Sequence, residues 1–203
     1  MRPFLHQRLR RIDELISASN LALQAYLEQN PSLANIVTRF FEQAGATYHR
    51  LGLSDGENEL LALGAQFAAA RHGIDPVSLE RRNHHRRELE RAVAVHVLQA
   101  GAARIRADGA RFWQTFDDTT ERLLPIVAVG IQKGLIPLAA NDPDAVELET
   151  IWRSLLDDRD LQAAARPIAM TIAQPDVVII IADLLAGLSS GIRLATADGA
   201  FST

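Results

Sequence analysis

The chain has 203 residues, 48% of them hydrophobic, and a formal net charge of −4 at pH 7. That length allows one domain with a substantial core or two small ones, and we expect a single all-helical domain over residues 1–188 followed by a loose tail over 189–203. The sequence contains no cysteine, which excludes disulfides, thiolate metal ligands and thiol nucleophiles. Its basic start lacks an apolar signal segment before Arg10 and Arg11, so we expect a cytoplasmic protein.

Two amphipathic helices are predicted in the first quarter of the chain. Over residues 5–27 apolar side chains recur at alternating steps of four and three, which favours one buried helix face. This face could pair with a second chain, but a stripe of three heptads more often packs inside a bundle. Asn30 and Pro31 supply a cap and a first-turn proline for a second helix that ends at Gly52, and the two helices are expected to form an antiparallel hairpin. The face of the first helix consists of Leu5, Leu9, Ile12, Ile16, Ser19, Leu23 and Tyr26.

The next two predicted helices are a short third helix and a long fourth helix whose two halves differ in polarity. Ser54 and Glu57 have the spacing of a capping box, which predicts a third helix from there to Gly73. Asp75-Pro76 opens a fourth, without a breaker until Asp108-Gly109. Its second half is apolar nearly all round, whereas its first half is polar, so we expect one end to be buried and the other to project.

Shorter helices are predicted between Phe112 and Ala173, with Pro125 and Pro167 as kinks or starts. The run from Val177 to Ile181 consists of five β-branched residues, a strand signal by propensity. We expect it to be helical, because no other segment of the sequence has a comparable strand propensity with which it could pair. The fold class is therefore all-α, a multi-helix bundle of about eight or nine helices with one long central helix.

Two motifs that could carry catalytic or metal-binding chemistry are better explained as a helix end and as ordinary surface side-chain pairs. Residues 187–191 match the G-x-S-x-G nucleophile elbow, but no histidine follows His96 and no strand precedes Ser189. A helix C-terminus at Gly187 or Gly191 explains that motif better. Glu80, His84 and Glu88 share a face of the predicted fourth helix, yet such spacing also suits ordinary surface pairs, so we predict no metal site, no cofactor and no catalytic constellation.

Two polar residues within apolar runs are predicted to be buried. His96 lies among valines and leucines, where it could bind haem but more often forms a hydrogen bond within a core. Asp183 would need a cationic partner in the core, for which Arg166 or Arg193 is available. The longest apolar runs are too short or too interrupted by proline and glycine to span a membrane, so we predict no transmembrane segment.

The densest positive cluster is the predicted partner-binding surface. Arginine suits acidic proteins and phosphates alike. A nucleic-acid partner is disfavoured by the net charge and by the lack of aromatic residues among the arginines. A solvated helix face is the alternative interpretation of the same residues. The cluster consists of Arg81, Arg82, His84, His85, Arg86, Arg87 and Arg91.

The sequence favours a non-enzymatic helical interaction protein, such as an adaptor, chaperone or assembly component, and self-association is one form of that function. The alternative is a bundle that binds a small apolar molecule between C-terminal helices. Aromatic residues at helical spacing more often form a core than a pocket, so this function ranks second. The ligand-binding residues would be Phe112, Trp113, Phe116, Trp152 and Met170.

Overall fold

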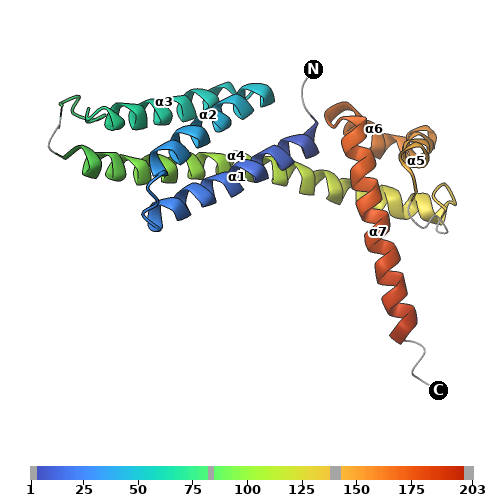
Figure 1. Cartoon of the computed structure of the whole chain (residues 1–203). Coiled ribbons are helices and arrows are strands. Elements are labelled where there is room, and N and C mark those ends of the chain that lie inside the picture. Colours follow the sequence, from blue (N-terminus) through green and yellow to red (C-terminus); the bar gives the residue numbers. More distant parts are fainter. Residues whose placement is uncertain (1–3, 82–84, 138–142, 199–203) are drawn as a thin grey trace. The chain divides into compact units, whose positions relative to one another are not determined.

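The protein is all-α. A computed structural model describes residues 4–81, 85–137 and 143–198, with side chains as far as Leu188. Within these residues there are seven helices and one isolated antiparallel bridge between Ile74 and Arg81 (Figure 1). The helices are α1 (Leu5–Leu27), α2 (Leu33–Leu51), α3 (Ser54–Arg71), α4 (Arg86–Gln132), α5 (Ala145–Asp157), α6 (Gln162–Thr171) and α7 (Gln174–Asp198).

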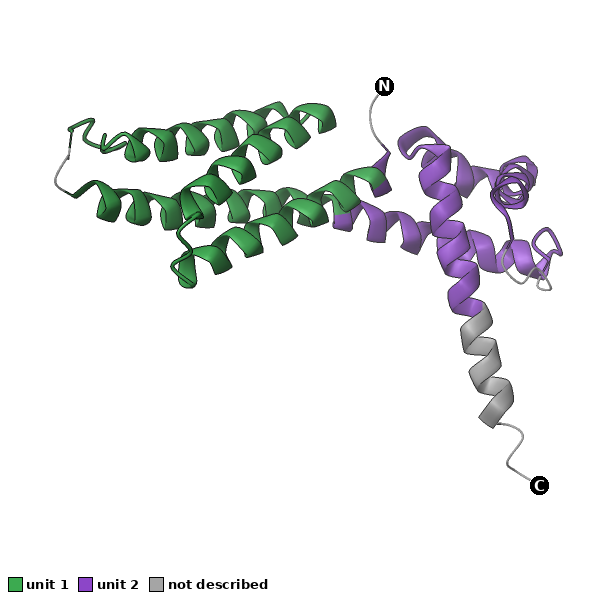
Figure 2. Ribbon diagram, in the orientation of Figure 1, with its two compact units in different colours: residues 1–3, 7–112 green, residues 4–6, 113–203 purple. Residues whose placement is uncertain are grey.

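The chain divides into two compact units, which are coloured separately in Figure 2. The first consists of Met1–Pro3 and Gln7–Phe112, and the second of Phe4–His6 and Trp113–Thr203. Each unit has its own cluster of buried apolar side chains. The single-domain organisation that we predict over residues 1–188 stays a prediction.

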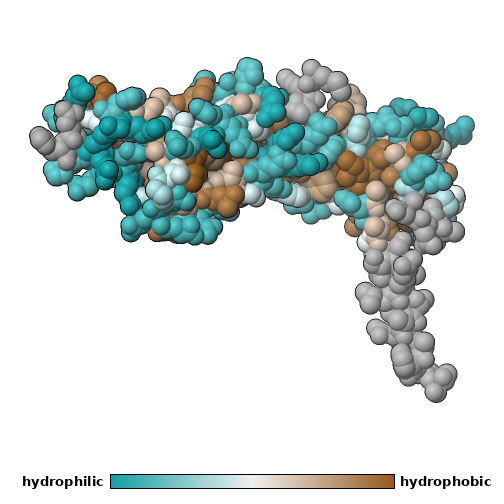
Figure 3. Space-filling view, viewed as in Figure 1, coloured by the Kyte–Doolittle hydropathy of each residue, from teal (hydrophilic) through white to brown (hydrophobic). Residues whose placement is uncertain are grey.

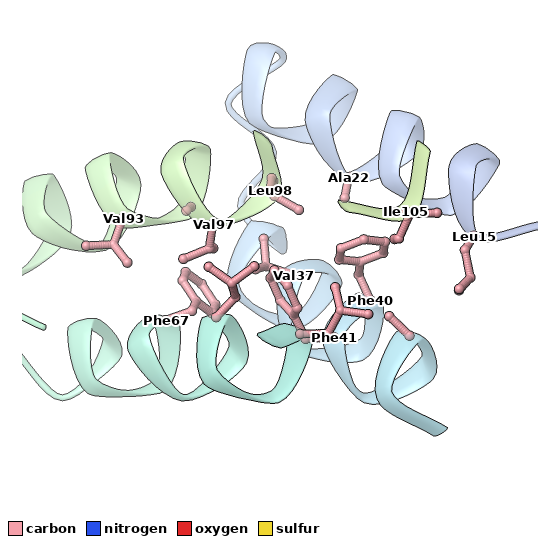
Figure 4. Packing of buried hydrophobic residues seen from close by; sticks show 14 of the residues in the cluster. Leu15, Ala22, Val37, Phe40, Phe41, Phe67, Val93, Val97, Leu98 and Ile105 are labelled. Atoms are coloured by element: carbon pink, nitrogen blue, oxygen red, sulfur yellow. The ribbon is translucent and has the colours of Figure 1, made fainter. Parts of the chain in front are cut away.

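In the first unit, α1 contributes its predicted apolar face to the core. Leu9, Ile12 and Ser19 of that face are buried. Ile16, Leu23 and Tyr26 are partly buried against the same cluster. The stripe is therefore used inside the unit, as we expected. Figure 4 shows it meeting side chains of α2, α3 and α4. Those partners include Val37, Phe40, Phe41, Phe67, Val93, Val97, Leu98 and Ile105.

The antiparallel helices α2 and α3 lie side by side because two glycines reduce the space between them (Figure 1). A Cβ on Gly45 would lie 3.1 Å from Cδ2 of Leu61, and one on Gly64 would lie 3.1 Å from Cβ of Phe41. Each glycine thus faces a large side chain of the opposite helix. Small residues at such positions allow two helix backbones to approach closely.

A polar network lies where α2, α3 and α4 meet, with Tyr48 and Asp108 buried and Glu59 exposed. The Tyr48 hydroxyl donates to Oδ2 of Asp108 over 3.1 Å, and Nε of Arg104 donates to the same oxygen over 2.8 Å. Nη1 of Arg104 also reaches Glu59 at 2.8 Å. Burial and the neighbouring Asp108 carboxylate raise the pKa of Tyr48 well above its usual range. Gly56 of α3 packs directly against the Tyr48 ring, where a side chain would overlap it.

The core of the second unit is formed by α5, α6, α7 and the last part of α4. Val177, Ile180 and Ile181 are fully buried on α7, which confirms the helix predicted for this β-branched run. Burial of three β-branched residues on one helix face outweighs their preference for strands. They pack in a cluster with Leu123, Ile126, Val127, Leu148, Ile151, Trp152, Leu155, Leu161, Ala165 and Ile168.

Asp176 in the first turn of α7 binds the first residues of α1, and all of these residues belong to the second unit. Its carboxylate accepts from the backbone amides of Leu5 at 2.7 Å and His6 at 3.1 Å, and it lies 2.6 Å from Nδ1 of His6. Asp176 is 3% exposed. The carboxylate therefore satisfies amides that an isolated helix N-terminus leaves without partners.

Three predicted boundaries are wrong. The fourth helix begins at Arg86 rather than Pro76, and it continues past Gly109 and Pro125 to Gln132. Gly109 is a contact point instead of a breaker, because a Cβ there would lie 2.9 Å from Ile12. Since several predicted helices are thus one, the described residues contain seven helices rather than eight or nine.

The C-terminal helix is also longer than predicted. Gly187 lies inside α7, which continues to Asp198, so the helix does not end at that glycine. A helix in this position supplies no strand before Ser189, as the nucleophile elbow requires. The predicted loose tail begins at residue 189, within α7, and its last residues 199–203 lie outside the described residues.

Candidate functional site

The structure places the predicted arginine cluster around the start of α4. Arg81 lies in the loop before the helix, and Arg86 and Arg87 are exposed in its first turn. His85 is exposed and lies 3.0 Å from Glu88. Arg82 and His84 lie outside the described residues.

Arg91 belongs to a different surface. Its guanidinium carbon lies 5.5 Å from the centre of the Tyr26 ring of α1, which is a cation–π distance. Arg91 is only partly exposed. It therefore has an aromatic partner within the unit.

Arg86 lines a groove on the first unit that runs along α3, which we call the α2–α3 groove. The groove encloses about 450 Å³, and its walls come from α2, α3 and the start of α4. Its apolar wall is formed by Phe41, Leu61, Gly64, Ala65, Phe67 and Ala68. Its polar lining is formed by Thr38, Glu42, Arg71, His72 and Arg86.

The apolar wall exists because α3 has apolar residues on more than one face. Leu60, Leu63 and Phe67 are buried in the core, whereas Leu61 is 52% exposed. One side of Leu61 packs over Gly45 of α2, and the rest of its side chain faces solvent. Hydrophobic residues that reach the surface are visible on the face shown in Figure 3. The groove is therefore an apolar surface without a partner among the described residues.

The polar lining of the groove carries more positive than negative charge. Nη1 of Arg71 donates to the neutral hydroxyl of Thr38 over 3.1 Å. Within the described residues, neither Arg71 nor Arg86 has a carboxylate within 4.0 Å. Glu42 is the acidic residue of the lining. Two guanidinium groups thus face one carboxylate at the edge of an apolar wall.

The loop between α3 and α4 adds apolar side chains close to this edge in sequence. Val77 is 92% exposed and Leu79 is 77% exposed. Leu79 has a φ of 59°, which is unusual for a residue with a γ-branched side chain. Asp75 shapes the loop, because its carbonyl accepts from the Leu79 amide and its side chain accepts from the Val77 amide.

The five predicted pocket residues have different surroundings in the two units. Phe112 packs against the core cluster of the first unit, with the Arg8 guanidinium carbon 5.5 Å from its ring centre. In the second unit, Trp113 is 44% exposed and contacts Phe116 edge to face, whereas Trp152 is 2% exposed. Met170 is 87% exposed.

Other candidate residues also differ from expectation. His96 and Asp183 are exposed rather than buried, so neither needs a partner inside a core. Glu80 lies in the loop before α4, so it does not share a helix face with Glu88, and His84 lies outside the described residues. Within the described part of the chain no three His, Asp or Glu side chains are grouped closely enough to hold a metal ion.

Comparisons with known protein-family models, curated proteins and solved structures gave no match for this chain. Among its described residues, no helix combines the length and the apolar character needed to cross a membrane.

Proposed function

We propose that this protein is a non-enzymatic binding module whose α2–α3 groove holds an amphipathic helix with acidic flanking residues, supplied by a partner protein. The observation that carries the proposal is the exposed Leu61 at the side of a 450 Å³ groove whose guanidinium groups lack a carboxylate partner in the described residues.

The shape of the groove suits a helix. Leu61, Gly64, Ala65 and Ala68 are spaced at three and four residues, so they lie along one face of α3. Three of these four residues are small, which allows another helix to approach the α3 backbone closely. Helices that bind in grooves do so with apolar residues at positions i, i+3 or i+4 and i+7.

The positive charge of the groove favours acidic residues in the partner helix. Arg71 and Arg86 favour carboxylates, with which guanidinium groups form bidentate hydrogen bonds. A basic helix would meet both arginines and bury unpaired like charges, which costs affinity. Acidic residues beside the apolar stripe are therefore expected in the occupant.

The proposal can be tested by selection from a displayed library of helical peptides of about 18 residues, roughly five turns. We expect enriched peptides to combine an apolar stripe with flanking Asp or Glu. Leu61→Glu should weaken binding of an enriched peptide at least about tenfold, since it loses apolar burial and adds a like charge. Arg71→Gln should weaken it too, and added salt should reduce the effect of Arg71→Gln.

The matched control is Leu21→Glu, which changes a leucine of α1 that is 66% exposed and lies outside the groove. It should leave peptide affinity unchanged. Failure to enrich any peptide, or equal binding by the Leu61→Glu and Leu21→Glu variants, would refute the proposal. A wild-type dimer that Leu61→Glu converts to a monomer in light scattering would instead make a second copy of this chain the occupant.

The small-molecule function remains a prediction, and we do not propose it. Its five residues are divided between a core cluster of the first unit, a partly exposed aromatic pair, a buried tryptophan and an exposed methionine.

A further inference from the structure

A second hollow on the first unit is lined by arginines and is distinct from the α2–α3 groove. It encloses about 380 Å³ between the first two turns of α1 and the last turn of α2. Its lining consists of Gln7, Arg10, Arg11, Thr47, Arg50 and Leu51. No residue of this set lines the groove described above.

The hollow carries an excess of positive charge. Glu14 lies 2.8 Å from Nη1 of Arg11 and 3.4 Å from Nε of Arg10, so one carboxylate serves two guanidinium groups. The hydrogen bond from Arg11 lowers the pKa of Glu14, which favours its ionised form. Arg50 contacts only neutral oxygens among the described residues, the Ala46 carbonyl at 3.2 Å and the Thr47 hydroxyl at 3.3 Å. Three cationic groups thus face a single anion.

Arg10, Arg11 and Arg50 line one hollow and repel one another, and Glu14 offsets part of this charge. An anion in the hollow would relieve the remaining repulsion among the three arginines.

The donor set indicates the class of anion. Guanidinium groups bind phosphate oxygens through paired hydrogen bonds, and three of them can pair with the oxygens of two neighbouring phosphate groups. The half-open hollow, at about 380 Å³, has room for more than a single small anion. No aromatic side chain is among the described residues of the lining, so a nucleobase would find no stacking surface.

We propose that this hollow binds a ligand with two closely spaced phosphate groups, in which Arg10, Arg11 and Arg50 bind the phosphate oxygens. Gln7 and Thr47 supply neutral polar groups at its wall. The ligand is a free diphosphate or the bisphosphorylated headgroup of a lipid, which share this chemistry. The proposal is independent of the proposed function, because its residues lie outside the α2–α3 groove.

Calorimetry with inorganic pyrophosphate on the whole chain at low salt tests the proposal. We expect saturable binding with one site per chain, at least tenfold weaker binding of orthophosphate, and loss of affinity as salt rises. Vesicles of phosphatidylcholine with and without phosphatidylinositol bisphosphate separate the two sources. Sedimentation of the protein only with the bisphosphorylated lipid identifies a headgroup, whereas binding of pyrophosphate alone identifies a free ligand.

Substitutions distinguish a built site from general attraction to a cationic surface. Arg50→Gln should weaken pyrophosphate binding at least tenfold. Arg39→Gln on the same helix is the matched control, because Arg39 is exposed and lies outside the hollow, and it should change affinity less than twofold. Wild-type protein that binds neither probe overturns the proposal, and so does equal weakening by the two substitutions. Circular dichroism of both variants verifies that α2 is retained.

Discussion

Gly56 offers a severe test of the packing in the first unit, because its substitution by alanine should destabilise a helix that alanine would ordinarily favour. Gly56 lies in the first turn of α3. A Cβ there would lie 2.4 Å from Cε1 and 2.7 Å from Cδ1 of Tyr48. Carbon atoms in contact normally lie about 3.5 to 4.0 Å apart. The tyrosine cannot move into solvent, since it is fully buried and its hydroxyl donates to Asp108.

Two opposing terms decide the magnitude. Replacing glycine by alanine within a helix contributes about 0.5 to 1 kcal/mol of stability. Overpacking of a rigid core costs about 1 to 3 kcal/mol, and the overlap of more than about 1 Å places Gly56→Ala in the upper part of that range. We therefore expect the free energy of unfolding to fall by about 1 to 2 kcal/mol.

The assay is urea denaturation followed by far-UV circular dichroism, with Gly45→Ala as the matched control in the same unit. A Cβ on Gly45 would lie 3.1 Å from the end of the Leu61 side chain, which is half exposed and can rotate away. Gly45→Ala should change stability by less than about 0.5 kcal/mol, because the propensity gain offsets the adjustment. Unchanged or increased stability of Gly56→Ala would refute the contact between α3 and the Tyr48 ring.

Two further predictions concern buried polar groups. The raised pKa of Tyr48 means that the unfolded chain loses the phenol proton at about pH 10 while the folded chain retains it, so stability should fall as pH rises above that value. In a Tyr26→Phe variant, which leaves Tyr48 as the sole tyrosine, tyrosinate absorbance should appear together with loss of helical circular dichroism; its appearance in folded protein would contradict the network. Asp176→Asn should lower stability by about 1 to 2 kcal/mol, because Oδ2 accepts from the Leu5 amide and Oδ1 from the His6 amide, and the substitution replaces one of these two acceptors by a donating NH2 group. Thermal unfolding followed by tryptophan fluorescence in the second unit measures this change, and an unaltered melting temperature would count against the contact.

Helix ends with strong local signals were predictable from the sequence. Gly52 and Gly73 have φ values of 69° and 74°, and they follow the ends of α2 and α3 as expected. By contrast, Ser54 does not cap α3, which begins at Ser54 itself, and Glu57 lies 3.1 Å from His49. A complete capping box is formed by Asp144 and Glu147, whose D-x-x-E spacing is present in the sequence.

Which face of an apolar helix is buried was not predictable from local pattern. Residues around His96 are apolar nearly all round, so the pattern does not select one face. In the structure Val93, Val97 and Leu98 are buried and His96 lies on the exposed side. Its predicted core position is wrong for that reason.

For the candidate site too, part could be predicted from the sequence and part could not. The arginine cluster was visible as composition, and the structure places Arg86 of that cluster in the groove lining. The apolar wall was not, because Leu61 resembles its buried neighbours Leu60 and Leu63 in sequence. Its exposure depends on how α3 is rotated against α2.

The all-α class follows from local sequence, because apolar periodicity, caps and terminal glycines act within a few residues of one another. Tertiary contacts were needed to establish that α4 continues through Gly109 and Pro125, that Asp176 binds the first amides of α1, and where the groove and the arginine hollow lie. These features arise from contacts between residues far apart in the chain. Burial against Ile12 and the core around Leu123 stabilises α4 where local propensity would end it.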